Sequence, residues 1–253
     1  MLDQIKQQIS RVKALGASYV DTRWYPVEET NSLLMWNGNL KESSATFESG
    51  LGVRVLYHGA WGFSASSDTS DLAALYDRAL DNARISSERL SLPVRLAEKD
   101  AIQAKFVSPN KINPFEVPLS EKVAFLSEMD KKLNQPGVTQ RASSLTFTRK
   151  QIIFVDSEGS EIEKVITEVF AGLEVDGVDS EGGMHERKFS PSRRGDSRGW
   201  ETIDLQHFSE NAERIVRELN DTLNADPCPV DDRSVILLPG IMYLQTHKTI
   251  GHA

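Results

Sequence analysis

The spacing of apolar side chains along the chain predicts four amphipathic helices. Residues 1–16 repeat apolar positions every three or four residues, which is the period of a helix with one buried face. The same period recurs in three later segments: residues 71–87, 121–135 and 204–225. A further helix is expected after Pro239-Gly240, close to the last residues of the sequence.

Two other regions alternate apolar and polar residues with a period of two, which is typical of strands with one buried face. They cover residues 18–66 and 138–175. Asn37-Gly38 predicts a hairpin turn in the first region, because this pair tolerates the positive φ angles of a tight turn. Each region predicts a β-meander, so the expected fold class is α+β, with largely antiparallel β-meanders flanked by helices. An arrangement of two similar units in tandem stays open, without a sequence repeat to support it.

Three segments lack a clear helical or alternating pattern. Residues 88–118 carry four prolines and little periodicity, so a linker-like connection is expected there. Residues 177–199 are expected to form a loop that contains a basic cluster, Arg187 to Arg198, interpreted as a mobile surface loop or else as a site for an acidic partner. Ser234 to Leu238 is predicted to be a short buried strand.

Composition narrows the possible partners. The net charge of −8 argues against nucleic-acid binding, which depends mainly on clustered lysine and arginine. No apolar run approaches the ~20 residues of a membrane helix, and the first residues lack the features of a signal peptide. Cys228, the single cysteine, cannot form an internal disulfide and is interpreted as an inert thiol. The expected location is cytoplasmic, with no nucleic-acid or membrane partner.

His247 and His252 are the only closely spaced pair among the five histidines. On a regular helix at ~100° per residue, positions i and i+5 lie ~140° apart and cannot share a metal. A π-type turn would bring the two rings together, and Gly251 makes such a distortion less costly. A shared metal ion therefore stays an open alternative. The remaining histidines are interpreted as solvated or capping residues: His58, His185 and His207.

Three passages resemble the TldD/PmbA family of bacterial metallopeptidases, also called modulators of DNA gyrase. They are residues 48–66, 152–163 and 235–253. The likeness covers essentially the whole chain but only the N-terminal half of the family's full length. It implies a TldD/PmbA N-terminal α+β domain at residues 1–225. Residues 226–253 would then begin the metallopeptidase C-terminal region, truncated after its His-x-x-x-x-His motif.

The resemblance also implies roles for the closing motif. His247 and His252 match the family's two zinc-binding histidines, whereas Lys248 occupies the position of its general-base glutamate. In the family a cysteine of the C-terminal half completes the metal site. Zinc lowers the pKa of its bound water to about 7, and a carboxylate then accepts the proton, which a protonated lysine cannot do. No catalytic residue and no other cofactor site is expected in this chain, and zinc binding is expected to be weak or absent.

Two functions follow as hypotheses from the resemblance. In the first, the chain is the N-terminal part of a zinc metallopeptidase that hydrolyses peptides, inactive by itself, within a homodimer or a TldD/PmbA-type heterodimer. In the alternative, it is a non-catalytic, PmbA-like partner subunit of a heteromeric peptidase. A role as a DNA-binding regulator would rest on the family label alone, and the acidic charge speaks against it.

Overall fold

The computed structural model describes residues 1–190, 197–205 and 207–252. The chain divides into two compact units, Met1–Leu223 and Asn224–Ala253. The helices of the first unit are α1 (Leu2–Ala14), α2 (Leu72–Ser87), α3 (Leu119–Leu133), α4 (Glu201–Leu205) and α5 (Phe208–Leu223). Its strands are β1 (Tyr19–Trp36), β2 (Asn39–Tyr57), β3 (Ala60–Ser66), β4 (Gln103–Val107), β5 (Gln140–Asp156), β6 (Glu161–Val178) and β7 (Met184–Phe189).

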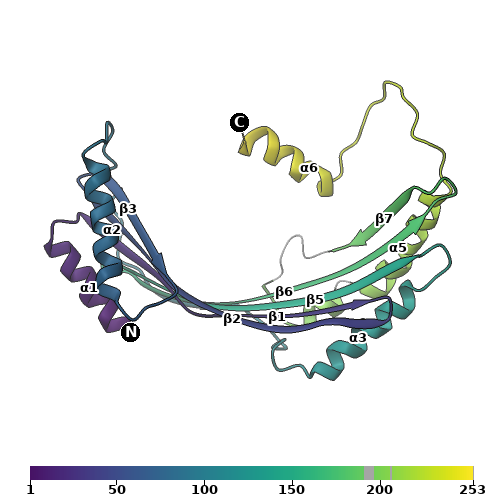
Figure 1. The fold of residues 1–253 in the computed structure, drawn as a ribbon, viewed down its shortest axis with the longest axis horizontal. Helices are drawn as coiled ribbons and strands as arrows, with labels where there is room; N and C mark the ends of the chain where they lie inside the picture. The colour runs from purple at the N-terminus through teal and green to yellow at the C-terminus, as the bar shows by residue number, and fades with distance from the viewer. Residues whose placement is uncertain (191–196, 206, 253) are drawn as a thin grey trace. The chain divides into compact units, whose positions relative to one another are not determined.

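The described strands form one seven-stranded sheet. Its order is β3-β2-β1-β5-β6-β4, and β7 pairs with another part of β6 (Figure 1). All pairs are antiparallel except β4 with β6. The predicted α+β class with a mainly antiparallel sheet is confirmed. The two meanders are not separate units in tandem, since β1 pairs with β5 along most of its length and joins them into one sheet.

Two helical layers cover the same face of this sheet. Figure 1 shows α1 and α2 at one end of the bent long strands and α3 and α5 at the other. On β5, Val155 packs with the α1 and α2 core, whereas Leu145 and Phe147 pack with the α3 and α5 core. These residues are an even number of positions apart, so their side chains project from one face. We call the opposite face, which carries Lys150 and Thr146 of β5, the open face.

The two hairpins of the first meander are closed by two-residue turns. Asn37 and Gly38 have φ angles of 47° and 78°, and His58 and Gly59 have 48° and 81°. Positive φ at both central residues is the geometry that matches the twist of the flanking strands. The turn predicted at Asn37-Gly38 is therefore confirmed.

Some segments without a clear sequence pattern contain structure that the sequence did not reveal. Residues 88–118 include β4, which is exposed along its whole length and, within the described part of the chain, pairs with β6 only. Residues 177–199 include β7, so the prediction of a loop throughout was wrong. Part of the predicted basic loop, residues 191–196, lies outside the described residues. The predicted helix at 204–225 begins later, because His207 at φ 50° separates α4 from α5.

The second unit holds one helix that continues into a wider turn. α6 (Pro239–Thr246) is followed directly by a π-helical turn, His247–Gly251. The strand predicted at Ser234 to Leu238 was wrong: the segment pairs with no described strand, and Ile236 is 89% exposed. An apolar run cannot make a strand when no neighbouring strand takes its backbone hydrogen bonds. Among the described residues, no helix is both long and apolar enough to cross a membrane.

Candidate functional site

The two histidines of the closing motif meet in the π-helical turn. His247 Nε2 and His252 Nε2 lie 2.9 Å apart, and one ring nitrogen donates a hydrogen bond to the other. The rings are nearly perpendicular, at 81°. The wider turn carries residue i+5 back over residue i, which a regular helix would not do. The π-type turn that the spacing left open as an alternative is present.

The geometry of this histidine pair fits a metal ion in place of the shared proton. Tetrahedral zinc with bonds of about 2.0–2.1 Å holds two ligand nitrogens about 3.3 Å apart. The observed 2.9 Å would need to open by only about 0.4 Å. Gly251 provides room, since a Cβ there would lie 3.3 Å from His247 Nδ1. Both imidazoles are exposed and therefore accessible to an ion from solution.

Two ligands are only part of a zinc site, and Lys248 lies between them in sequence. Among the described residues, no third histidine, cysteine or carboxylate lies within 4.8 Å of both imidazoles. Cys228 is exposed and not part of such a group. Lys248 is exposed and carries no carboxylate that could accept a proton from a metal-bound water. The pair can hold an ion but does not supply the chemistry of a complete hydrolytic centre.

An acidic cluster on β6 and β7 is the only described group of three metal-ligating side chains that lies close together. Glu174, Asp176 and Glu186 have carboxylate oxygens within 4.8 Å of one another. Lys188 pairs with Glu174 at 3.1 Å and with Glu186 at 2.7 Å. Burial, and then the two neighbouring carboxylates, raise the pKa of Asp176. Lys188 offsets one of the three possible negative charges and joins Glu174 to Glu186 in an ion-pair network across β6 and β7.

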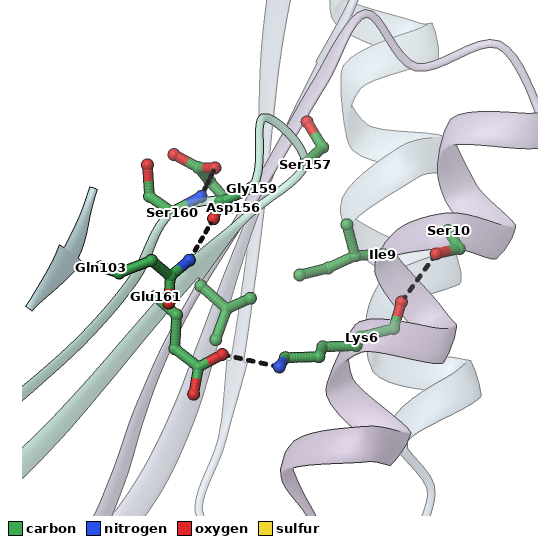
Figure 2. A pocket seen from close by; sticks show the side chains of 10 residues that line it. Lys6, Ile9, Ser10, Gln103, Asp156, Ser157, Gly159, Ser160 and Glu161 are labelled. Carbon is green, nitrogen blue, oxygen red and sulfur yellow. Dashed lines mark hydrogen bonds and ion pairs between the residues drawn. The ribbon is translucent and has the colours of Figure 1, made fainter. Parts of the chain in front are cut away.

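A cleft of about 320 Å³ lies between α1 and the β5–β6 turn (Figure 2). Lys6 and Glu161 bridge it with an ion pair of 2.6 Å. Ser157 Oγ accepts a hydrogen bond from the Val20 amide, and Ser160 Oγ accepts one from the Ile102 amide. The lining contains no histidine, and these polar side chains hold the turn in place. The cleft therefore lacks a base beside a free nucleophile.

Sequence reasoning missed the two buried carboxylates Asp21 and Asp156. Asp21 accepts three hydrogen bonds from Arg54 and one from Arg23, and its side chain is 1% exposed. Asp156 accepts hydrogen bonds from Lys99 at 2.5 Å and from the amides of residues 158 and 160 at 2.9 Å. The Asp-Ser-Glu-Gly-Ser passage was a usable signal, because aspartate often binds amides two to four residues later in a turn. Both carboxylates stabilise the sheet end.

The other histidines and Cys228 lie apart from any candidate centre. His185 Nε2 lies 2.7 Å from Asp179 Oδ2, which is a local contact next to β7. His207 is 3.6 Å from Glu210, and His58 stacks on Tyr57 in a hairpin turn. Within the described part of the chain, none of them joins a group of three metal-ligating atoms. Their interpretation as solvated or capping residues stays a prediction.

Two parts of the chain match one protein family. Residues 27–83 match its domain described as PmbA/TldA metallopeptidase domain 1, and residues 112–223 match the PmbA/TldA metallopeptidase central domain. A metalloprotease of Methanocaldococcus jannaschii is 30% identical over 249 residues, covering 98% of this chain and 53% of the relative. A metalloprotease of Methanothermobacter thermautotrophicus is 26% identical over 235 residues, covering 93% of this chain and 50% of the relative. The chain thus spans about half the length of the curated relatives it matches.

Solved structures share the fold. A Thermotoga maritima protein, described as a proposed modulator of a DNA gyrase, has a TM-score of 0.67 at 14% identity and covers 90% of this chain and 50% of its own. TldE from Thermococcus kodakarensis has a TM-score of 0.55 at 12% identity, and the match covers 85% of this chain and 47% of TldE. At such low identity the likeness concerns the fold alone.

Proposed function

Because the chain belongs to the TldD/PmbA family, we propose that it contributes the first and central domains, together with two zinc ligands, to a cytoplasmic metallopeptidase that hydrolyses peptides. The observation that carries this proposal is the 2.9 Å approach of His247 Nε2 to His252 Nε2 in a π-helical turn. The relatives named as metalloproteases support the metal and the reaction class. Residues 1–225 would form the N-terminal α+β domain and 226–253 the start of the metal-binding region. The family matches end at residue 223, which supports this division.

His247 and His252 would hold the ion, and zinc would supply a Lewis acid and a bound water of lowered pKa. The chain itself would contribute two imidazole nitrogens, which the π-helical turn places close enough together to bind one ion. The remaining ligand would come from outside the described residues. The general base, whose position Lys248 occupies, would come from a second chain, in a homodimer or a TldD/PmbA-type heterodimer. With Lys248 beside the pair, the chain by itself is expected to be inactive.

A complementation experiment tests this function. The part of the M. jannaschii metalloprotease that this chain does not match would be added as a separate polypeptide, with zinc and a fluorogenic peptide. The Lys248→Glu variant with that polypeptide should hydrolyse the peptide in a chelator-sensitive way. The unchanged chain with the polypeptide, and either chain alone, should not. Chelator-sensitive hydrolysis by either chain alone, or none by the complemented variant despite bound zinc, would contradict the proposal.

The second candidate is a non-catalytic partner subunit, and Lys248 at the position of the base favours it. Such a subunit would keep the fold of the family but could not accept a proton from a metal-bound water, because Lys248 stands at the position of the base. It predicts that the chain co-purifies with a TldD-type chain that retains His-Glu-x-x-x-His and that peptide hydrolysis depends only on that chain's glutamate. A chain that stays monomeric in its presence would exclude this role.

A further inference from the structure

Arg23 of β1 presents one edge of its guanidinium on the open face of the sheet. Its direct partner on β5 is Phe154, which lies an even number of residues from Lys150, so both side chains are on that face. Arg23 Nη1 donates a hydrogen bond to Asp21 Oδ1 at 3.1 Å, and the guanidinium carbon lies 5.3 Å from the centroid of the Phe154 ring. These contacts hold the group in place, while its Nε–Nη2 edge meets no acceptor among the described residues. The Arg23 side chain is 44% exposed, so a ligand from solution can reach this edge.

Arg54 shows which chemical group such an edge binds. Its Nη2 lies 2.6 Å from Asp21 Oδ2, and its Nε lies 3.2 Å from Asp21 Oδ1. Two parallel hydrogen bonds of this kind match the geometry of a carboxylate or a phosphate. Because the Nε–Nη2 edge of Arg23 carries the same two donors, the ligand class that it fits is an oxyanion.

The charges around Arg23 also favour an anion. Asp21 is a single carboxylate bound by two guanidiniums, and its side chain is 1% exposed, whereas those of the two arginines are 44% and 41% exposed. The neighbouring carboxylates of Asp156 and Glu158 are paired with a cation of their own, Lys99, at 2.5 and 3.6 Å. An oxyanion that approaches this point of the open face therefore meets positive charge first.

An apolar groove begins beside Arg23. Arg23, Gly52 and Ala65 are direct partners across three adjacent strands, and the two small residues leave space above this row. The Phe63 ring borders the space, 3.4 Å from where a Cβ on Gly52 would be, and is 58% exposed. The groove has a volume of about 490 Å³, within the range of about 300–1,000 Å³ that is typical of small-ligand pockets. Its lining also includes Tyr25, Gly50, Leu51, Ser66 and Ser67.

The opposite end of the groove is acidic. Tyr25 and Gly50 also line a second cavity of about 280 Å³, together with Glu28 and Glu48. The two glutamates are direct cross-strand partners, an arrangement in which like charges repel each other. A second negative charge on a ligand would be unfavourable here. The oxyanion of a ligand therefore belongs at Arg23, and its uncharged part extends toward Tyr25.

We propose that Arg23 and this groove bind a small aromatic oxyanion, namely an aromatic ring that carries one carboxylate or one phosphate. The oxyanion accepts two parallel hydrogen bonds from Nε and Nη2 of Arg23. The ring lies over Gly52 and packs against the Phe63 ring, with which it gains an aromatic contact in addition to its burial. This site lies within the first unit, and its binding requires neither the histidine pair nor hydrolysis.

A ligand series tests the assignment by titration calorimetry of the full 253-residue chain in EDTA, at millimolar ligand. Benzoate should bind with one molecule per chain. Benzamide, which has the same shape without the charge, should bind at least about tenfold more weakly. Terephthalate places a second carboxylate at the acidic end and should bind about threefold more weakly than benzoate, or weaker still. Phenyl phosphate distinguishes the two oxyanions, since the tighter of phenyl phosphate and benzoate identifies the preferred group.

Variants of the chain locate the site. Arg23→Gln should weaken benzoate binding at least about tenfold and leave benzamide binding within about twofold, because only the charged ligand uses the guanidinium edge. Gly52→Val fills the space above the row and should weaken both ligands. Arg149→Gln is the matched control: Arg149 is 42% exposed and ion-paired with Glu29, but it lies at an odd position of β5, on the opposite face. It should leave binding unchanged.

Thermal melting establishes that each variant is folded. Equal binding of benzoate and benzamide by the unchanged chain would overturn the proposal, and so would the absence of binding by both benzoate and phenyl phosphate. Folded Gly52→Val that binds benzoate as tightly as the unchanged chain, or equal losses in Arg23→Gln and Arg149→Gln, would also overturn it. The ligand series and Gly52→Val keep the test decisive even where Arg23→Gln does not fold.

Discussion

Replacing Asp156 by alanine should destabilise the first unit by an amount that the structure allows to be worked out. The Asp156 side chain is fully buried and accepts hydrogen bonds from Lys99 and from the amides of residues 158 and 160. Ser160 is 1% exposed, so its amide would lose its partner away from water, at a cost of about 1–3 kcal/mol. The Lys99 side chain is 40% exposed, which limits its ion pair to about 1 kcal/mol.

Asp156→Ala should therefore lower the free energy of unfolding by about 2–4 kcal/mol, which corresponds to a melting temperature lower by roughly 5–15 °C for a unit of this size. Asp156→Asn is the matched control, because its amide oxygen still accepts from both backbone amides while the charge is lost. Asp156→Asn should lower the free energy of unfolding by about 1 kcal/mol. Differential scanning calorimetry measures the melting temperatures of both variants. Melting of Asp156→Ala within 2 °C of the unchanged chain, or equal losses in the two variants, would refute this reasoning.

The same carboxylate predicts a pH dependence. Burial acts to raise the pKa of Asp156, but hydrogen bonds from Lys99, Ser160 and Glu158 outweigh it and hold the pKa below its ordinary value. A carboxylate with a lowered folded-state pKa contributes stability that is complete above its unfolded pKa of about 3.9 and is lost as pH falls through the folded pKa. The stability difference between the unchanged chain and Asp156→Asn should thus be constant above about pH 5 and shrink below pH 4. A difference that grows on acidification would contradict this sign.

Three further predictions concern single side chains. Gly62→Ala should lower the free energy of unfolding by about 3 kcal/mol or more in chemical denaturation, since the new Cβ would lie 2.1 Å from a backbone oxygen of α2. Gly52→Ala should leave it nearly unchanged, because its Cβ would lie 3.4 Å from the Phe63 ring. Gly251→Ala should weaken zinc binding roughly twofold to fivefold in a calorimetric titration, because the new methyl group crowds an imidazole at 3.3 Å. Burial raises the pKa of Tyr19 and of Tyr76, so replacing either with phenylalanine should reduce the most alkaline part of the phenol absorbance titration, and replacing both should remove it; a titration unchanged in both single variants would contradict this.

Local chemistry made parts of the fold predictable from sequence. Asn37-Gly38 specified its turn because few other pairs accept positive φ twice. The i to i+5 spacing of His247 and His252, with Gly251 between them, left a π-type turn open as one alternative, and the structure contains such a turn. In both cases a short stretch of sequence restricts the backbone without help from distant residues.

The elements that sequence reasoning missed depend on partners far along the chain. β4 has five exposed residues and exists because β6, more than fifty residues later, takes its hydrogen bonds. Residues Ser234 to Leu238 show the reverse, since an apolar run without a partner forms no strand. The buried pair of Asp21 with Arg54 likewise depends on the pairing of β1 with β2. The candidate metal pair could be proposed from a local motif and its resemblance to the family, and its metal binding stays a prediction.

The central claim, that His247 and His252 form a metal site, is tested most directly by calorimetric titration of the chain with zinc. We expect one zinc ion per chain, bound loosely because two histidines are only part of a tetrahedral site. His247→Ala and His252→Ala should each abolish this binding, whereas His58→Ala, which changes an exposed histidine in a hairpin turn, should leave it unchanged. Zinc binding that survives in both variants of the pair, or that is lost with His58→Ala, would contradict the account.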